Sequence, residues 1–225
     1  MGEKTKAEGG YWRGRYEKRV TSWLLTCGIL ALPCIAAFIV AATVLAPGYC
    51  HLTETVSRLG GAEMSHPQVM NVGLVSFGLL MMGFGWGLYR FLRGKKGALR
   101  TGMLVSIFGL GILVAGIVPI DHRDANEPTT TGLVHAAGAG VAYVAMVLAT
   151  FSLARFVNGD KNWRWFAKLS VGVVLVSLAL AITFTLDSSE PVRGLLQRFF
   201  YGLPIIWMQF VALRILWLGR AENMG

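Results

Sequence analysis

"SWLLTCGILALPCIAAFIVAATVLAP", residues 22–47, is a long stretch without a single charged side chain. A helix needs about 20 apolar residues to cross a hydrocarbon core of about 30 Å, so this stretch is long enough to span a bilayer. Five further apolar blocks follow, at about 68–92, 98–120, 131–154, 167–186 and 196–218. The sequence therefore predicts an all-α membrane protein built as a bundle of six transmembrane helices.

The composition agrees with a membrane protein. Of the 225 residues, 54% are hydrophobic and only 15% are charged, whereas a soluble domain carries about 25% charged residues. Residues 1–21 form a basic segment ahead of the first span. Because that span is long and five more follow, we interpret it as a membrane helix rather than a cleaved signal peptide. Residues 22–220 then form one six-span domain with short connections.

Basic residues gather at alternate ends of the predicted spans. Seventeen of the 21 Lys and Arg lie within 4–19, 90–100, 155–168 and 214–220. By the positive-inside rule, this side faces the cytoplasm, so both termini lie on the cytoplasmic side of the cell membrane. The net charge of +9 then reflects orientation and attraction to anionic membrane lipids, so no nucleic acid is expected as a partner.

The polar stretch "HLTETVSRLGG", residues 51–61, follows the first span on the outer side. Read as a helix, it has a polar face and an apolar face, made by His51, Glu54 and Arg58 and by Leu52, Val56 and Leu59. This pattern predicts a short amphipathic helix at the membrane interface. The glycine pair would end it.

The outer side also holds all four histidines of the chain. His135 lies near the start of the fourth apolar block, where an imidazole needs a hydrogen-bond partner, and Asp121 or Asp124 in the preceding loop is the expected partner. Gln197 and Arg198 begin the sixth block, and Arg198 is expected to tie segments together or to hold an anionic headgroup. We predict an outward-facing polar pocket formed by His51, Glu54, Ser57, Asp121, His122, His135 and Arg198.

Several chemistries fit these residue types. His135 with Asp121 would perform acid–base work, and with Ser57 it would complete a hydrolase triad, although no nucleophile elbow surrounds Ser57. His122, His135 and Asp121 offer nitrogen and oxygen ligands suited to zinc, but their spacing matches no compact zinc signature. The structural alternative is that these side chains only hydrogen-bond loops to helices and that the stretch after the first span is a solvated connector.

Three segments carry a family resemblance: "PGYCHLTETVSRLG" (47–60), "GIVPIDHRDANEPTTTGLVHAAGAG" (116–140) and "LLQRFFYGLPIIWMQFVALRIL" (195–216). With the spans between them, the chain resembles the bacterial and archaeal membrane family catalogued as domain of unknown function 998, over roughly residues 22–220. The resemblance implies a six-span membrane protein and supplies no activity. It implies recurrent polar positions at Ser57, Asp121, His135, Gln197 and Arg198.

Three classes of function remain open. The first is a protein that binds or processes a lipid or other amphiphile, with membrane lipids as partners. The second is a small transporter or channel, which would need polar residues in the middle of the spans, where this chain has almost none. The third is a structural or assembly subunit without a site. If the protein is an enzyme, the residues favour a membrane-embedded hydrolase, with zinc as the candidate metal.

Overall fold

Six long helices make up the fold in the computed structural model, which describes residues 2–94, 96–121, 129–157 and 164–221. All six are long and apolar enough to cross a membrane, and no strand occurs in these ranges. In chain order the elements are α1 (Gly2–Val44), the 3-10 helix η1 (Val56–Gly60), α2 (Pro67–Leu92), α3 (Ala98–Ile117), α4 (Thr130–Val157), α5 (Arg164–Phe184), the 3-10 helix η2 (Asp187–Val192) and α6 (Arg193–Ala221). The predicted six-helix bundle is confirmed, and the chain is a multi-pass membrane protein.

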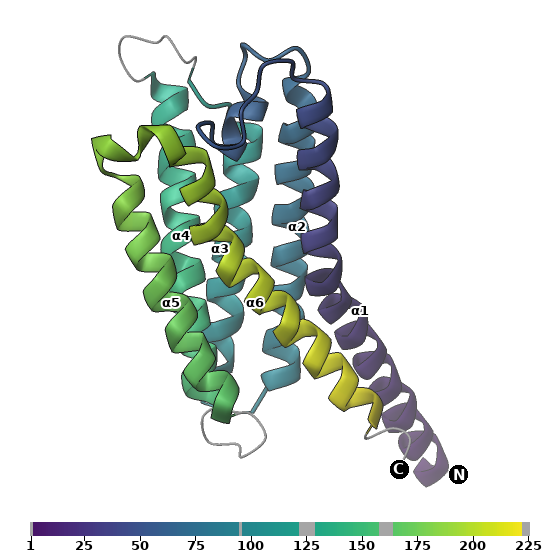
Figure 1. The fold of residues 1–225 in the computed structure, drawn as a ribbon. Helices are drawn as coiled ribbons and strands as arrows, with labels where there is room; N and C mark the ends of the chain where they lie inside the picture. Colours follow the sequence, from purple (N-terminus) through teal and green to yellow (C-terminus); the bar gives the residue numbers. More distant parts are fainter. Residues whose placement is uncertain (1, 95, 122–128, 158–163, 222–225) are drawn as a thin grey trace.

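The helices pack as a ring in sequence order. Each of α1 to α5 packs against the next helix in the chain, and α6 closes the ring against α1. In Figure 1, α6 crosses the front of the bundle diagonally, from beside α5 at one end to beside α1 at the other. The chain starts and finishes at the same end of the bundle. We call this the terminal end, and the opposite end, which carries η1 and η2, the loop end.

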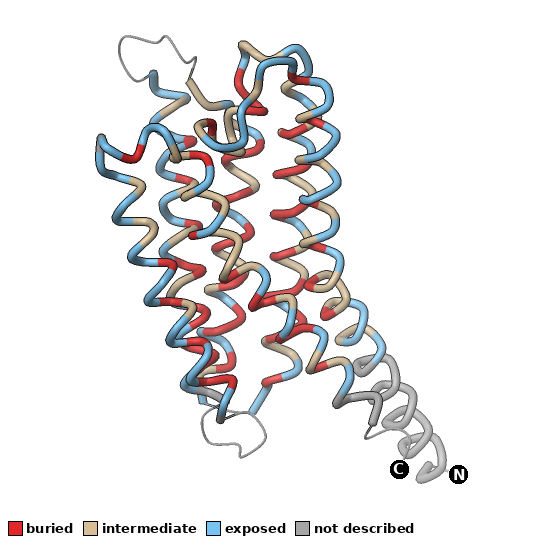
Figure 2. Tube along the Cα trace, viewed as in Figure 1, coloured by how far each residue is buried: buried red, intermediate tan, exposed pale blue. Residues whose placement is uncertain are grey.

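Burial follows the pattern of a protein in lipid. Buried residues lie along the inward faces of the helices and exposed residues along the outward faces (Figure 2). Large apolar residues such as Leu79, Leu175 and Ile182 are among the exposed ones. In water such surfaces would be costly, but hydrocarbon tails are as apolar as these side chains. The outer surface of the bundle is therefore suited to lipid.

Small residues let neighbouring helices approach closely. A Cβ added at Gly78 of α2 would lie 2.6 Å from the Gly109 carbonyl oxygen of α3, and one at Gly109 would lie 2.5 Å from the Gly78 oxygen. Gly111 of α3 meets α4 in the same way, because a Cβ there would lie 2.5 Å from the Gly138 carbonyl oxygen. Gly140 differs, because nothing lies within 4 Å of a Cβ built there.

A proline in α6 leads to hydrogen bonds that connect three helices. Pro204 has no N–H, so the Phe200 carbonyl one turn earlier loses its helical partner. The Ser177 hydroxyl of α5 donates to that carbonyl at 2.7 Å. In turn, the Tyr143 hydroxyl of α4 lies 3.0 Å from Ser177 Oγ. The carbonyl that Pro204 leaves without a helical partner thus accepts a hydrogen bond that connects α6 to α5, and through Ser177 to α4.

The predicted amphipathic helix after the first span is not confirmed. Residues 51–54 form turns, and only Val56–Gly60 are helical, as a short 3-10 helix. The expected faces also differ from the observed ones, because Glu54 is buried and Leu52 is exposed. The contacts explain the difference. The Glu54 carboxylate accepts from the Cys50 N–H within the loop, and Arg198 of α6 donates to the backbone carbonyls of His51 and Glu54.

Candidate functional site

The residues predicted from sequence form two groups at the loop end. His51, Glu54, Ser57, Gln197 and Arg198 lie where the segment after α1 meets α6. Asp121 and His135 lie at the start of α4. His122 lies outside the described residues. Of the residues predicted to form one pocket, Ser57 and Arg198 line the same cavity, which is described below.

Arg198 ties the first loop to α6. Its Nη1 donates to three carbonyl oxygens, those of His51 and Glu54 at 2.9 Å and that of Gly194 at 2.8 Å. Its Nη2 lies 2.5 Å from the Tyr49 hydroxyl and 2.9 Å from His51 Nδ1. Since a guanidinium only donates, His51 Nδ1 accepts and its ring hydrogen sits on Nε2. These contacts give Arg198 the tying role that the sequence left open.

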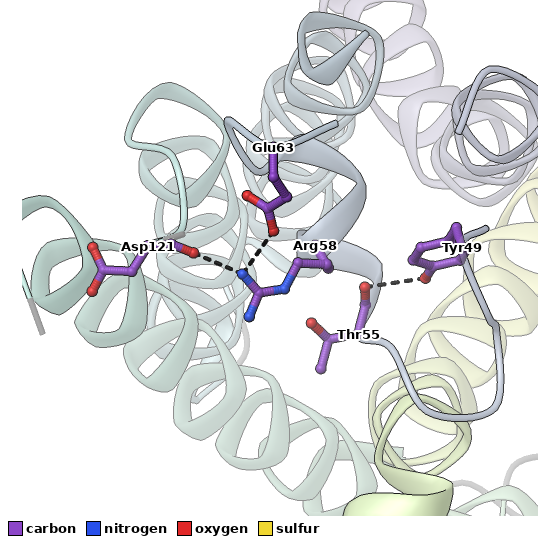
Figure 3. A network of polar contacts seen from close by, with 5 residues as sticks. All are labelled: Tyr49, Thr55, Arg58, Glu63 and Asp121. Carbon is purple, nitrogen blue, oxygen red and sulfur yellow. Dashed lines mark hydrogen bonds and ion pairs between the residues drawn. The ribbon is translucent and has the colours of Figure 1, made fainter. Parts of the chain in front are cut away.

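Tyr49 extends the same network into the loop. Its hydroxyl accepts from Arg198 and points its own hydrogen at the carbonyl oxygens of Glu54, at 3.2 Å, and Thr55, at 3.1 Å (Figure 3 shows the Thr55 contact). Burial raises the pKa of Tyr49, against the opposing effect of the nearby guanidinium. The phenol therefore keeps its hydrogen and remains a donor.

Gly194 allows the loop to reach the helix. A Cβ at this position would lie 2.2 Å from the Glu54 carbonyl oxygen and 2.7 Å from that of His51. The Leu195 N–H of α6 also donates to the Leu52 carbonyl at 3.0 Å. The backbone of the loop therefore rests directly on the first turn of α6, which leaves no room for a side chain between them.

A second arginine, Arg58, connects the two groups of residues. Arg58 of η1 forms an ion pair with Glu63 at 2.9 Å, and the same nitrogen donates to the Asp121 carbonyl oxygen at 2.7 Å. Figure 3 shows Arg58 between these two partners. Because Arg58 contacts the backbone of Asp121, the Asp121 carboxylate remains available to α4.

Asp121 holds the residue that caps α4, Thr129, whose hydroxyl accepts from the Gly132 N–H at 3.1 Å. The Asp121 carboxylate accepts from the Thr129 backbone N–H at 3.0 Å and from the Thr129 hydroxyl, which is even closer. These hydrogen bonds lower the pKa of Asp121, with the Thr129 hydroxyl as the largest cause. The absence of a side chain at Gly132 leaves room for the carboxylate, because a Cβ there would collide with it. This arrangement stabilises the helix end.

His135 is buried one turn further along α4, with 5% of its surface exposed. Its Nδ1 lies 2.8 Å from the Val118 carbonyl oxygen at the end of α3. A carbonyl only accepts, so Nδ1 carries the hydrogen and Nε2 is the nitrogen that could hold a metal or a proton. The predicted partner of this imidazole was an aspartate, and the bond is made to the backbone instead.

A cavity of about 190 Å³ lies beneath η1, inside the bundle. Its walls are apolar side chains of α1, α2, α3, α4 and α6, including Ile35, Phe77 and Ile112. Its polar lining gathers at the loop end, and we call the residues Ser57, Gln197 and Arg198 the ceiling. Ile206, which is 43% exposed, also lines the cavity.

Two ceiling residues keep polar groups that the protein does not use. Gln197 accepts the Val56 N–H through Oε1 at 2.6 Å, which leaves its amide nitrogen without a hydrogen bond to any residue that the structure describes. The Ser57 hydroxyl likewise bonds to no described residue. In an apolar cavity such groups are the natural contacts for a ligand.

The geometry supports a metal site or a hydrolase triad less than it supports a ligand cavity. Within the described ranges, no three His, Cys, Asp or Glu side chains lie close enough to hold a metal ion. Ser57 lines the cavity, while the Asp121 carboxylate is bonded to Thr129 and His135 Nδ1 to Val118. His122, one of the three predicted zinc ligands, is outside these ranges.

Sequence reasoning missed three contributors. Tyr49 was passed over, although it lies two residues before the polar stretch and follows a proline and a glycine. Glu63 was assigned no role, although it pairs with Arg58. Tyr201 lines the cavity and donates to the Ala139 carbonyl at 2.7 Å. A tyrosine inside an apolar block is a signal, because a hydroxyl in hydrocarbon needs an acceptor.

The comparisons with known proteins agree with the resemblance seen in the sequence. A family model described as "Protein of unknown function (DUF998)" matches residues 29–214. No match was found among curated proteins or among solved structures.

Proposed function

The chain belongs to the DUF998 family, and we propose that this membrane protein binds a lipid or other amphiphile in the cavity beneath η1. The observation that carries the proposal is an apolar cavity whose unused polar groups all lie at one end. An amphiphile has the same division, with a chain for the walls and a headgroup for the ceiling. Because Ile206 lines the cavity and is 43% exposed, we infer that such a ligand would enter past Ile206, from the lipid-facing side of α6.

The size of the cavity suits part of a chain rather than a whole lipid. An engineered cavity of about 150 Å³ holds one benzene molecule, and this one is slightly larger, at about 190 Å³. A few carbons of the ligand next to its headgroup would fill it. The rest of the chain would extend past Ile206 into the bilayer.

Filling the cavity tests the proposal. Gly202 of α6 lines it, and nothing lies within 4 Å of a Cβ built there, so Gly202→Phe places an aromatic ring in the cavity. Replacing a helical glycine also favours the helix, so folding should survive. The matched control is Gly172→Phe on α5, where nothing lies within 4 Å either and the residue does not line the cavity.

The measurement is native mass spectrometry of the purified protein in a nonionic detergent with added palmitate. We expect bound palmitate for the natural chain and for Gly172→Phe, and its loss for Gly202→Phe. Equal binding by all three proteins would show that the ligand does not occupy this cavity, and the proposal would then fail.

The same proposal includes an orientation, with both termini in the cytoplasm and the ceiling on the outer side of the cell membrane. Cys50 provides the test, because it is exposed at the loop end whereas Cys27 and Cys34 lie within α1. Hydrogen bonds from the backbone of Thr53 and Leu52 lower the pKa of Cys50, which favours its reactive thiolate. A membrane-impermeant maleimide should label this protein in intact cells, and Cys50→Ser should abolish the labelling of the protein. Labelling only after lysis would reverse the orientation.

A further inference from the structure

We propose that the ligand presents hydrogen-bond acceptor oxygens to the ceiling, as a carboxylate or a phosphate does, and that ammonium headgroups are rejected. This inference rests on the proposed function and specifies its ligand class. It follows from three features of the ceiling: the direction of one amide, the free hydroxyl beside it, and the sign of the charge that lines the cavity.

The direction of the Gln197 amide is fixed by chemistry. The Val56 N–H can only donate, so the atom 2.6 Å from it is the amide oxygen. The nitrogen, with two hydrogens, is then the polar group that Gln197 has left for the cavity that it lines. A ligand meets a donor at this position, and the best partner for a donor is an acceptor oxygen.

Ser57 and the charge of Arg198 point the same way. The Ser57 hydroxyl is adjacent to Val56 and lines the same cavity without a bond to a described residue, so it can donate as well. Arg198 adds a positive charge to the lining, whereas no acidic side chain of the described residues lines the cavity. An ammonium headgroup would meet two donors and a like charge in an apolar space, which is unfavourable.

One substitution should invert the preference. In Gln197→Glu, one carboxylate oxygen can keep the bond to the Val56 N–H, while the other replaces the amide nitrogen with a negatively charged acceptor. The control is Gln68→Glu, which adds the same charge at the exposed start of α2, also at the loop end but outside the cavity. This control removes any effect of general surface charge.

The experiment compares three probes with the same chain, palmitate, hexadecyl phosphate and hexadecylamine, by native mass spectrometry in a nonionic detergent. The natural chain and Gln68→Glu should bind the two anions at least about tenfold more tightly than the amine, as expected for one charge-assisted hydrogen bond. Gln197→Glu should favour the amine. The tighter of the two anions identifies the source of the headgroup, a fatty acid or a phospholipid.

The outcomes separate this inference from the proposed function. If all three probes bind equally to the natural chain and all are lost in Gly202→Phe, the cavity binds amphiphiles without reading the headgroup, and only this inference fails. If Gln197→Glu keeps the preference for anions, Gln197 does not face the headgroup, and the inference is also overturned. If Gly202→Phe changes the binding of no probe, the proposed function fails with it.

Discussion

The ceiling of the cavity and the start of α4 are both polar clusters at the loop end, yet they use their polar groups differently. At the start of α4, the Asp121 carboxylate bonds to Thr129 and His135 Nδ1 bonds to the Val118 carbonyl. At the ceiling, Gln197 bonds through one end of its amide only, and the Ser57 hydroxyl bonds to no described residue. The first cluster holds the end of α3 and Asp121 to the start of α4, and the second faces an apolar cavity.

The difference shows what a polar residue in a membrane bundle does first. Backbone carbonyls at the ends of spans have no water to bond within the hydrocarbon, so nearby donors are used to satisfy them. Arg198, His135 and Arg58 all donate to carbonyls in this way. Polarity alone is therefore weak evidence for a site. A polar group that stays unpaired beside a cavity is stronger evidence.

The largest effect should come from Arg198→Ala. This change removes the donor that holds the carbonyls of His51, Glu54 and Gly194, and leaves those oxygens without their charged partner. We expect the free energy of unfolding to fall by about 3 kcal/mol, as for the loss of a charged group that makes several hydrogen bonds. Thermal unfolding in detergent, followed by tryptophan fluorescence, measures it.

Two further variants make this prediction specific. Arg198→Lys keeps the charge but loses the planar fork, so it should recover only part of the stability. Arg93→Ala removes an exposed arginine at the terminal end and should change the free energy of unfolding by less than about 0.5 kcal/mol. A full recovery by lysine would mean that the charge, and not the set of directed bonds, ties the loop to α6.

A smaller loss of stability is expected from His135→Ala. The variant leaves the Val118 carbonyl without its partner and removes a buried ring, which together should cost about 2 kcal/mol. Palmitate binding should be unchanged, because His135 does not line the cavity. The control is His66→Ala, since His66 is exposed and its side chain makes no capping bond to α2. If His135→Ala abolished binding without loss of stability, the start of α4 would belong to the site.

The sequence predicted the six helices because each block is long enough to span a bilayer and has its charges at its ends. It could not predict the loop after α1 in the same way. Periodicity assumes water on one face and lipid on the other, but Glu54 is buried and bonds to the Cys50 N–H at 2.8 Å.

The cavity was beyond prediction for a different reason. Its walls come from five helices and η1, so no local pattern records the space between them. The residues of the ceiling could be named, because Gln197 and Arg198 stand out at the start of an apolar block. Their roles could not, since the acceptors of Arg198 are backbone oxygens of a loop about 145 residues away along the chain. Any residue type in that loop has such oxygens.

The smallest effect should be the pH dependence that Asp121 adds to stability. Its pKa is lower in the folded protein than its usual value, because the carboxylate accepts from Thr129. The stabilisation is therefore fully present above about pH 4 and is lost as the pH falls below that value and the carboxylate takes up a proton. Asp121→Asn cannot lose this contribution, so the natural chain should lose more stability than the variant between pH 6 and pH 3 in the same unfolding assay. Equal losses would mean that the charge of Asp121 does not stabilise α4. Palmitate binding, compared at pH 6, should be the same for both proteins, because Asp121 bonds to Thr129 and does not line the cavity.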